Sequence, residues 1–251
     1  CGALEFSEAI SKSGTQPIIG TQVNFKFKEI AGLLPLIALN ENGYKKLIEI
    51  SSKSYLKSES DNEPVCNIED LIEKKDGLVV FSGSIQGLIG KLFNSGKYDY
   101  IEEIYQKLTD TYKENFYIEI QRHDDENEKL FENFNLKISK DLKIPIIATH
   151  EVFYKDPSLY EAHDALMCIG TKSYINDKNR LKLSNQHYLK SHNEMSELFS
   201  DLPVALENNY LFPYRNNFRP MHSKPILPDI GFEKGVNTDD LLKKLSSLLR
   251  F

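Results

Sequence analysis

The chain has 251 residues, of which 40% are hydrophobic and 27% are charged, and its formal net charge is −6. This length allows a substantial core, and the net acidity gives no overall electrostatic footprint for nucleic acid. No apolar run approaches the length of a membrane span, and three widely spaced cysteines suggest neither a disulfide framework nor a zinc knuckle. This cysteine usage is typical of a reducing cytoplasm.

The beginning of the chain predicts one helix and two strands. The helix covers residues 3–11 and ends at Gly14, and the strands cover residues 17–27 and 33–39. Because the sequence starts at Cys1 and enters almost directly into a helix, we expect a fragment that begins in mid-fold. A processed terminus is the alternative.

Strands and helices alternate through the next hundred residues. We predict a helix that Asn40 caps, helices at 67–74, 85–93, 98–112 and 127–142, and strands at 77–82, 116–121 and 144–148. This alternation argues for a mostly parallel sheet with helices outside it, either open or closed into a barrel.

The strand at 144–148 runs into a polar cluster formed by Thr149, His150 and Glu151. Asp156 and Pro157 then open a helix, as a cap and a first helical residue. A strand that ends in ionisable side chains before a helix is typical of the site in a barrel or open α/β fold. An ordinary strand end is the alternative.

After Gly170 the chain becomes polar and irregular. The lysines and the arginine at 172, 178, 180 and 182 form either a local basic patch or, by the alternative interpretation, a solvated loop face. Ser191 and Glu194 form a capping box for the next helix, and another helix covers residues 204–211. Residues 213–231 are typical of a linker or an extended arm, and Thr238 is expected to cap a final helix at 239–250.

Seven motifs follow one another along the chain. They are P-I-I-G at Pro17, N-E-N-G-Y-K-K-L-I-E-I-S-S at Asn40, Y-I-E-I-Q-R-H at Tyr117, I-P-I-I-A-T-H-E-V-F-Y at Ile144, E-A-H-D-A-L at Glu161, H-N-E-M-S-E-L-F at His192 and L-P-V-A-L-E-N at Leu202. Each alone is weakly specific. Together, in order and spacing, they resemble the PHP domain region of the alpha subunits of bacterial replicative DNA polymerase III. PHP stands for polymerase and histidinol phosphatase.

The resemblance implies an α/β fold in two parts. Residues 1–170 are expected to form a distorted (β/α)7 PHP-type barrel, and residues 171–251 a helical connector toward the polymerase palm. The family's two earliest strands carry a His-x-His pair and a Thr-Asp-His, which would lie upstream of Cys1, so the barrel should lack its first strands. We therefore expect the strands at Pro17 and Ile144 to have unpaired edges that invite association.

In the PHP family, His, Asp, Glu and Cys at strand ends hold divalent ions, which such ligands suit. At the matching positions this chain has Gln22 instead of Glu, Ser84 instead of Cys or His, and Phe153 instead of His. Glu151 can replace the family's Asp, and His123 is retained, although a structural role for His123 is the alternative. We expect a vestigial site at these five residues with no metal, and no catalytic or cofactor-binding residue in this chain.

Two functions compete. The first is a scaffold within a replicative polymerase, whose full-length protein performs template-directed DNA synthesis with magnesium held in the palm. The second is a metal-dependent PHP phosphoesterase or 3'-5' exonuclease. The resemblance further implies a cytoplasmic protein without membrane contact, which meets the other polymerase III subunits: the proofreading exonuclease and, through the full-length protein, the sliding clamp and primer–template DNA.

Overall fold

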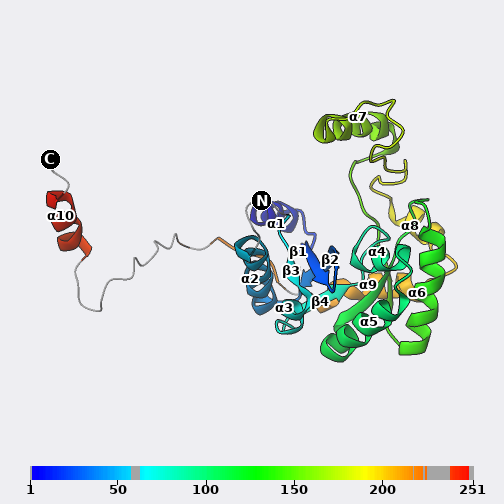
Figure 1. Ribbon diagram of the computed structural model, residues 1–251, viewed down its shortest axis with the longest axis horizontal. Coiled ribbons are helices and arrows are strands. Elements are labelled where there is room, and N and C mark those ends of the chain that lie inside the picture. Colours follow the sequence, from blue (N-terminus) through cyan, green and yellow to red (C-terminus); the bar gives the residue numbers. More distant parts are fainter. Residues whose placement is uncertain (1, 58–62, 217, 223, 225–237, 249–251) are drawn as a thin grey trace. The chain divides into compact units, whose positions relative to one another are not determined.

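The computed structural model describes residues 2–57, 63–216, 218–222, 224 and 238–248 (Figure 1). The chain divides into two compact units, residues 1–220 and 221–251. The first unit is a mixed α/β structure around one six-stranded sheet. The predicted boundary after residue 170, between barrel and connector, stays a prediction.

The strands of the sheet lie in the order β3-β1-β2-β4-β5-β6. Their bounds are β1 Gly20–Phe27, β2 Ile30–Ala38, β3 Cys66–Asn67, β4 Leu78–Phe81, β5 Phe116–Ile120 and β6 Ile146–Ala148. The five predicted strands are present, and the two-residue β3 is additional. The first unit also contains nine α-helices and two short 3-10 helices within the described residues. They are α1 Ala3–Lys12, α2 Glu41–Lys57, α3 Ile68–Ile72, α4 Leu88–Asn94, α5 Tyr98–Tyr112, η1 Lys113–Asn115, α6 Glu128–Leu142, η2 Pro157–Leu159, α7 Tyr160–Thr171, α8 His192–Leu198 and α9 Pro203–Arg215.

Three of the five neighbouring strand pairs are parallel, as a mostly parallel sheet requires, and β2 supplies the two antiparallel pairs. β1 and β2 form an antiparallel hairpin in which Phe27 pairs with Ile30, and β2 is also antiparallel to β4. Only Lys28 and Glu29 separate the hairpin strands, and a parallel crossover needs a dozen or more residues. Lys28 has a positive φ of 55°, as the first position of such tight turns requires. The sheet is parallel from β4 through β5 to β6.

The central strands are buried on both faces. On one side Val80, Ile118 and their neighbours belong to the main core, which the helices α2 to α6 cover. On the other side Phe81, Tyr117 and Ile147 pack around Phe212 of α9. Because side chains alternate along a strand, Glu119 lies on the same face as Tyr117.

The outer edge of β6 is covered by side chains of α9. The side chains of Asn208 and Asn209 on α9 form hydrogen bonds with the backbone of Ile146 and Ala148. The outer edge of β1 pairs with β3 only at Phe25 and Lys26. Among the described residues, the first half of the β1 edge has no strand partner, as expected, and β6 is an edge strand, as expected, whose outer backbone groups are bonded by side chains instead.

The helices agree with the prediction except at their ends. The capping box of Ser191 and Glu194 at the start of α8 is confirmed. Asp156 accepts a hydrogen bond from the Ser158 N–H at 3.1 Å, but it caps the 3-10 helix η2, and α7 begins after it. α9 continues four residues beyond the predicted end and through Pro213, because Phe212 packs on Phe81 and Arg215 bonds the Tyr117 hydroxyl at 2.5 Å.

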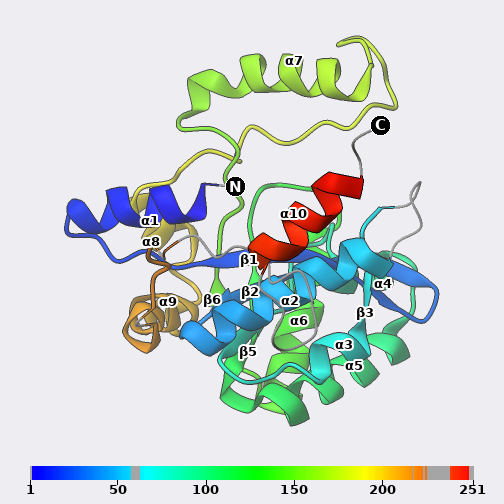
Figure 2. The same cartoon turned by 90° about the vertical axis from the view of Figure 1, so that its left-hand side faces the viewer.

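α7 stands away from the sheet in both views (Figures 1 and 2). Two extended segments, residues 149–156 and 172–190, connect it to the rest of the first unit. In the second unit, α10 spans Thr238–Leu248, one residue earlier than predicted at its start. The predicted end at Arg250 and the second part of the predicted linker, residues 225–231, lie outside the described residues. None of the described helices is long and apolar enough to cross a membrane.

Candidate functional site

The ends of β5 and β6 bring the predicted site residues together. These neighbouring strands are parallel, and Ile120 pairs with Ala148. The residues that follow the two strands, 121–123 and 149–151, therefore emerge side by side at one edge of the sheet. This is where an open or closed α/β fold places its site.

Three of the five predicted residues meet in one small cavity. Gln22 from β1, Ser84 from the segment after β4 and Glu151 from the segment after β6 line a space of ≈ 60 Å³, together with Gln121. The cavity contains one carboxylate and several uncharged polar groups. Three of the five candidate positions thus converge, and two of these, a Gln and a Ser, offer weak ligands to a divalent ion.

His123 lies behind this cavity and is 1% exposed. Its Nε2 accepts a hydrogen bond from the Glu151 N–H at 3.1 Å, so its proton must reside on Nδ1. Nδ1 then donates to Glu128 Oε1 at 3.1 Å, and Glu128 Oε2 accepts the His123 backbone N–H at 2.6 Å. Both ring nitrogens are engaged by protein groups, an arrangement typical of a structural histidine.

His123 is the middle ring of a stack of three imidazoles. His150 lies on one side at 4.3 Å between centroids, and His187 lies on the other at 4.1 Å, with planes 5° apart. Burial, helped by the neighbouring His123, lowers the pKa of His150 from 6.5 to about 4. His150 is therefore neutral at neutral pH, and its Nε2 hydrogen-bonds the Gln186 carbonyl at 2.7 Å.

One group of potential metal ligands occurs among the described residues: His123, Asp125 and His187. His187 Nδ1 lies 3.2 Å from the Glu151 carbonyl, and its Nε2 lies 3.9 Å from Asp125 Oδ1. However, the His123 and His187 rings are stacked with their planes 5° apart, and the lone pair of each imidazole nitrogen lies in the plane of its own ring. A zinc ion at about 2.0–2.1 Å from each nitrogen cannot lie in both planes. These three residues can bind a metal ion only if the His123 ring reorients and breaks its hydrogen bonds with Glu128 and the Glu151 N–H.

Phe153 lies apart from the cavity. Its side chain is 47% exposed and contacts the rings of His163 and His187, with centroids 5.6 and 5.4 Å away. Its backbone N–H donates to the His187 carbonyl at 2.9 Å. The position expected for a histidine ligand thus carries an apolar ring that packs on the histidine stack, and it offers no donor atom.

Glu119 is a second carboxylate close to this edge of the sheet and is 6% exposed. Its Oε1 accepts hydrogen bonds from the Thr149 hydroxyl at 2.5 Å and from Gln121 Nε2 at 3.2 Å. Burial raises the pKa of Glu119, and the nearby Glu151 carboxylate adds to the increase. Glu119 is thus poised toward its protonated form, which is a poor metal ligand.

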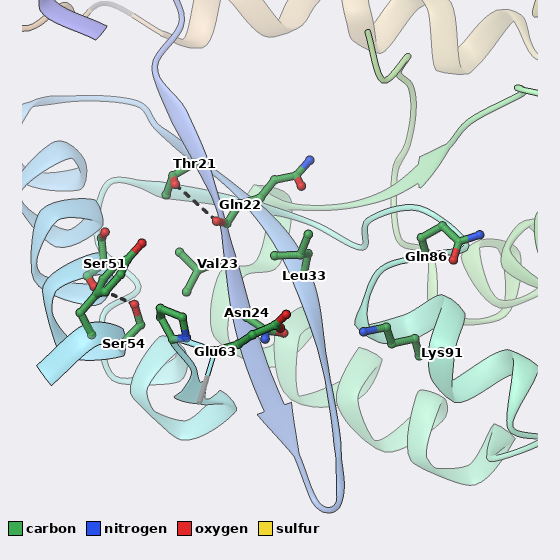
Figure 3. Close-up of a pocket in the computed structure, with 12 residues that line it drawn as sticks. Thr21, Gln22, Val23, Asn24, Leu33, Ser51, Ser54, Glu63, Gln86 and Lys91 are labelled. Atoms are coloured by element: carbon green, nitrogen blue, oxygen red, sulfur yellow. Dashed lines mark hydrogen bonds between the residues drawn. The ribbon is translucent and has the colours of Figure 1, made fainter. Parts of the chain in front are cut away.

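A larger cavity of ≈ 510 Å³ lies over β1 and shares Gln22, Leu33 and Gln86 with the small cavity, but no histidine of the described residues lines it. Figure 3 shows Ser51 and Ser54 approaching it from α2, and Gln86 and Lys91 from the opposite side. Its lining is mostly uncharged and polar, and the Lys91 ammonium is already bonded to the Ala31 carbonyl at 3.0 Å. The cavity lacks a paired base and nucleophile, so its size alone does not make it an active site.

The first half of the chain, residues 1–123, matches the family model of the PHP domain. Residues 1–123 belong to the PHP domain family. The chain is also similar to proteins named DNA polymerase III subunit alpha. The protein of this name from Rickettsia bellii is 36% identical over 97% of this chain, and the one from Caulobacter vibrioides is 32% identical over 96% of this chain. The protein of that name from Borreliella burgdorferi is 33% identical over 94% of this chain. This chain spans 21–22% of the length of these relatives.

The PHP domain match includes Gln22, Ser84 and His123, whereas Glu151 and Phe153 follow it. Sequence reasoning did not identify Asp125, His187 or Gln121 as part of this region. His187 lies in an irregular stretch 64 residues after His123 and has no spacing signal. Only the folded path of the chain after α7 brings it onto the His123 ring.

Proposed function

We propose that this chain is the PHP region of the alpha subunit of a bacterial replicative DNA polymerase III. In this proposal the full-length protein performs template-directed DNA synthesis. The observation that carries it is the similarity of 32–36% identity along 94–97% of the chain to proteins of that name. Such similarity over both the PHP part and the segments after it is expected of a polymerase subunit and not of a stand-alone phosphatase.

We further propose that the sheet is the larger part of a distorted (β/α)7 barrel. The parallel run β4-β5-β6 and the helices around it support this architecture. The outer edge of β1 at residues 20–24 is free of strand partners among the described residues and is the place where further strands can add. The segment after residue 170 would then lead toward the palm.

Within the polymerase, this region acts as a scaffold without metal. Three features support this role: the amide of Gln22, the apolar ring of Phe153, and the hydrogen bonds on both nitrogens of His123. The alternative, a metal-dependent phosphoesterase or 3'-5' exonuclease, needs ions that generate hydroxide and clamp a phosphate. Glu119, Glu151 and His123 are the retained groups that favour it, and they are too few for a cluster of ions.

The chemistry of synthesis lies outside this chain in the proposal. Palm carboxylates of the full-length protein would hold magnesium, which supplies charge stabilisation for nucleotidyl transfer. The partners would be the other polymerase III subunits, including the proofreading exonuclease and the sliding clamp, together with primer–template DNA. The protein would work in the cytoplasm.

Two measurements test the proposal. Elemental analysis of the dialysed 251-residue chain should give far less than one zinc or manganese ion per chain; one or more would favour the phosphoesterase. The polypeptide of the complete reading frame should extend a primer on a template with magnesium, whereas this chain alone should neither extend nor degrade DNA. Absence of extension by the complete polypeptide would refute the polymerase assignment.

A further inference from the structure

The segment around α7 is a firmly built arm. We define the α7 arm as residues 155–189. Arg180 forms a two-point ion pair with Asp164 of α7, with N–O distances of 2.5 and 2.6 Å, and the two side chains are only 5% and 14% exposed. Arg180 Nε also donates to the Ile175 carbonyl at 3.1 Å. The segment after α7 is thereby fixed along the helix, since such paired geometry is specific as well as strong.

The base of the arm is fixed by tyrosines. The Tyr160 hydroxyl donates to the Leu183 carbonyl and the Tyr154 hydroxyl to the Ser184 carbonyl, both at 3.2 Å. Tyr154 also forms a β-bridge with Tyr188. The α7 arm is thus an ordered element held by its own interactions, in contrast to a loose surface loop.

The arm nevertheless exposes an apolar stripe. Ala162, Leu166 and Ile169 are spaced by four and three residues, so they lie on one face of α7, and Leu159 at the end of η2 comes three residues before Ala162. All four are exposed, Leu166 at 63% and Ile169 at 76%. Beyond α7, Tyr174 and Ile175 add further exposed apolar surface, at 79% and 61%.

Among the described helices and strands, α7 packs substantially only against the short η2, and both views show it standing away from the sheet (Figures 1 and 2). An amphipathic helix ordinarily buries its apolar stripe against a core. A contiguous apolar surface that an ordered element holds outward marks an interaction site.

We propose that this stripe on α7 docks against another part of the same, longer polypeptide and forms an interface between domains. The inference rests on the proposed polymerase assignment. Relatives that match this chain through the arm are about five times longer, so most of their polypeptide is available as a permanent partner. A permanent intramolecular partner explains how an apolar stripe is tolerated, because the stripe is then always covered.

The composition of the stripe disfavours two other occupants. DNA is bound by cationic groups, but the stripe itself carries none, and Arg180 is committed to Asp164. The exposed Lys172, Lys178 and Lys182 lie in the segment after α7 and not in the stripe. A second copy of the chain would pair stripe with stripe, and nothing in α7 provides charged pairs that would fix its register. An aliphatic surface of the same polypeptide is the partner that the exposed Leu and Ile side chains fit.

Cysteine accessibility tests the proposal. Leu166→Cys is placed in this chain and in the polypeptide of the complete reading frame, and maleimide labelling is followed at that peptide by mass spectrometry. Labelling should be about tenfold or more slower in the complete polypeptide, since a buried interface side chain reacts only on local opening. Leu130→Cys on α6, where Leu130 is 61% exposed, is the control and should react equally in both.

Equal labelling rates at position 166 would overturn the inference. Protection within the short chain that increases with protein concentration would instead indicate a second copy, and protection only after DNA is added would indicate a nucleic-acid surface. Primer extension is measured on the same complete polypeptide. If the complete polypeptide extends the primer but position 166 is labelled fast, only the docking inference is refuted. If position 166 is labelled slowly but the primer is not extended, the polymerase assignment is refuted and the burial of the stripe still holds.

Discussion

The side chain of Asn209 bonds the peptide backbone of Ala148 in both directions. The Ala148 N–H donates to Asn209 Oδ1 at 3.1 Å, and Asn209 Nδ2 donates to the Ala148 carbonyl. An amide side chain here replaces a neighbouring strand, because a primary amide has the same donor and acceptor pair as a peptide group. Asn208 supports it by donating to the Ile146 carbonyl at 2.7 Å. The last strand of the sheet is thereby protected from edge-to-edge association.

Replacing Asn209 should expose this edge. In Asn209→Ala two backbone groups of Ala148 lose their partners, so we expect the free energy of unfolding to fall by about 1–3 kcal/mol. Urea denaturation measures the change. Asn179→Ala, on an exposed position of the α7 arm, is the control and should change stability by less than about 0.5 kcal/mol. A loss at Asn209 no larger than in the control would contradict this role.

Arg122 connects three segments of the first unit. It bonds Glu132 on α6 through Nε at 2.9 Å and NH2 at 2.8 Å, and it bonds Asp201, before α9, at 2.6 and 2.8 Å. The Glu132 side chain is 3% exposed. Arg122→Gln leaves this carboxylate buried without its main partner, so we expect a loss of about 3 kcal/mol. Asp201→Asn should cost about 0–1 kcal/mol, because Asp201 is exposed.

The effect of Arg122→Gln should depend on pH. Burial raises the pKa of Glu132, but the hydrogen bonds from Arg122 and Lys129 outweigh it and leave the pKa below its ordinary value of 4.5. A carboxyl with a lowered folded-state pKa stabilises the fold above that value and loses this contribution as pH falls. The difference between wild type and variant should therefore shrink as pH falls below 4.5. Arg219→Gln is the matched control, and a difference that stays constant with pH would argue against the pair.

Glu119 should behave in the opposite way. Burial raises its pKa in the folded state, so its contribution to stability falls as pH rises from 4.5 toward the folded-state value. Glu119→Gln keeps an acceptor for Thr149 and removes the cost of ionisation. We expect the variant to gain stability relative to wild type as pH rises above 4.5, as measured by urea denaturation. Glu126→Gln, on an exposed position, should show no such gain, and its absence at Glu119 would refute the prediction.

The lowered pKa of His150 predicts that the free energy of unfolding decreases on mild acidification. Its folded-state pKa of about 4 is below the ordinary 6.5, so the unfolded state binds more protons between these values. Stability should decrease as pH falls from 6.5 to 4, and His150→Gln should flatten this slope, since Gln can still donate to the Gln186 carbonyl. His192→Gln, at an exposed position, is the control. An unchanged slope in His150→Gln would contradict the prediction.

The sequence alone determined the elements of this protein and the family of its first half. Apolar runs and capping residues are local signals, so β4, β5, β6 and the capping box of α8 were predictable within a few residues. Motifs in fixed order pointed to five candidate site positions, and three of them, Gln22, Ser84 and Glu151, line one cavity. That the site is vestigial stays a prediction.

Only the tertiary structure decided how strand edges and side chains are satisfied. Asn209 lies 61 residues from Ala148, and His187 lies 64 residues from His123, so no local pattern links either pair. The hairpin of β1 and β2 follows from a two-residue turn whose length becomes clear only when both strand ends are known. Contacts between distant residues depend on the path of the whole chain, and this is why the covered edge of β6, the imidazole stack and the outward stripe of α7 were not foreseen.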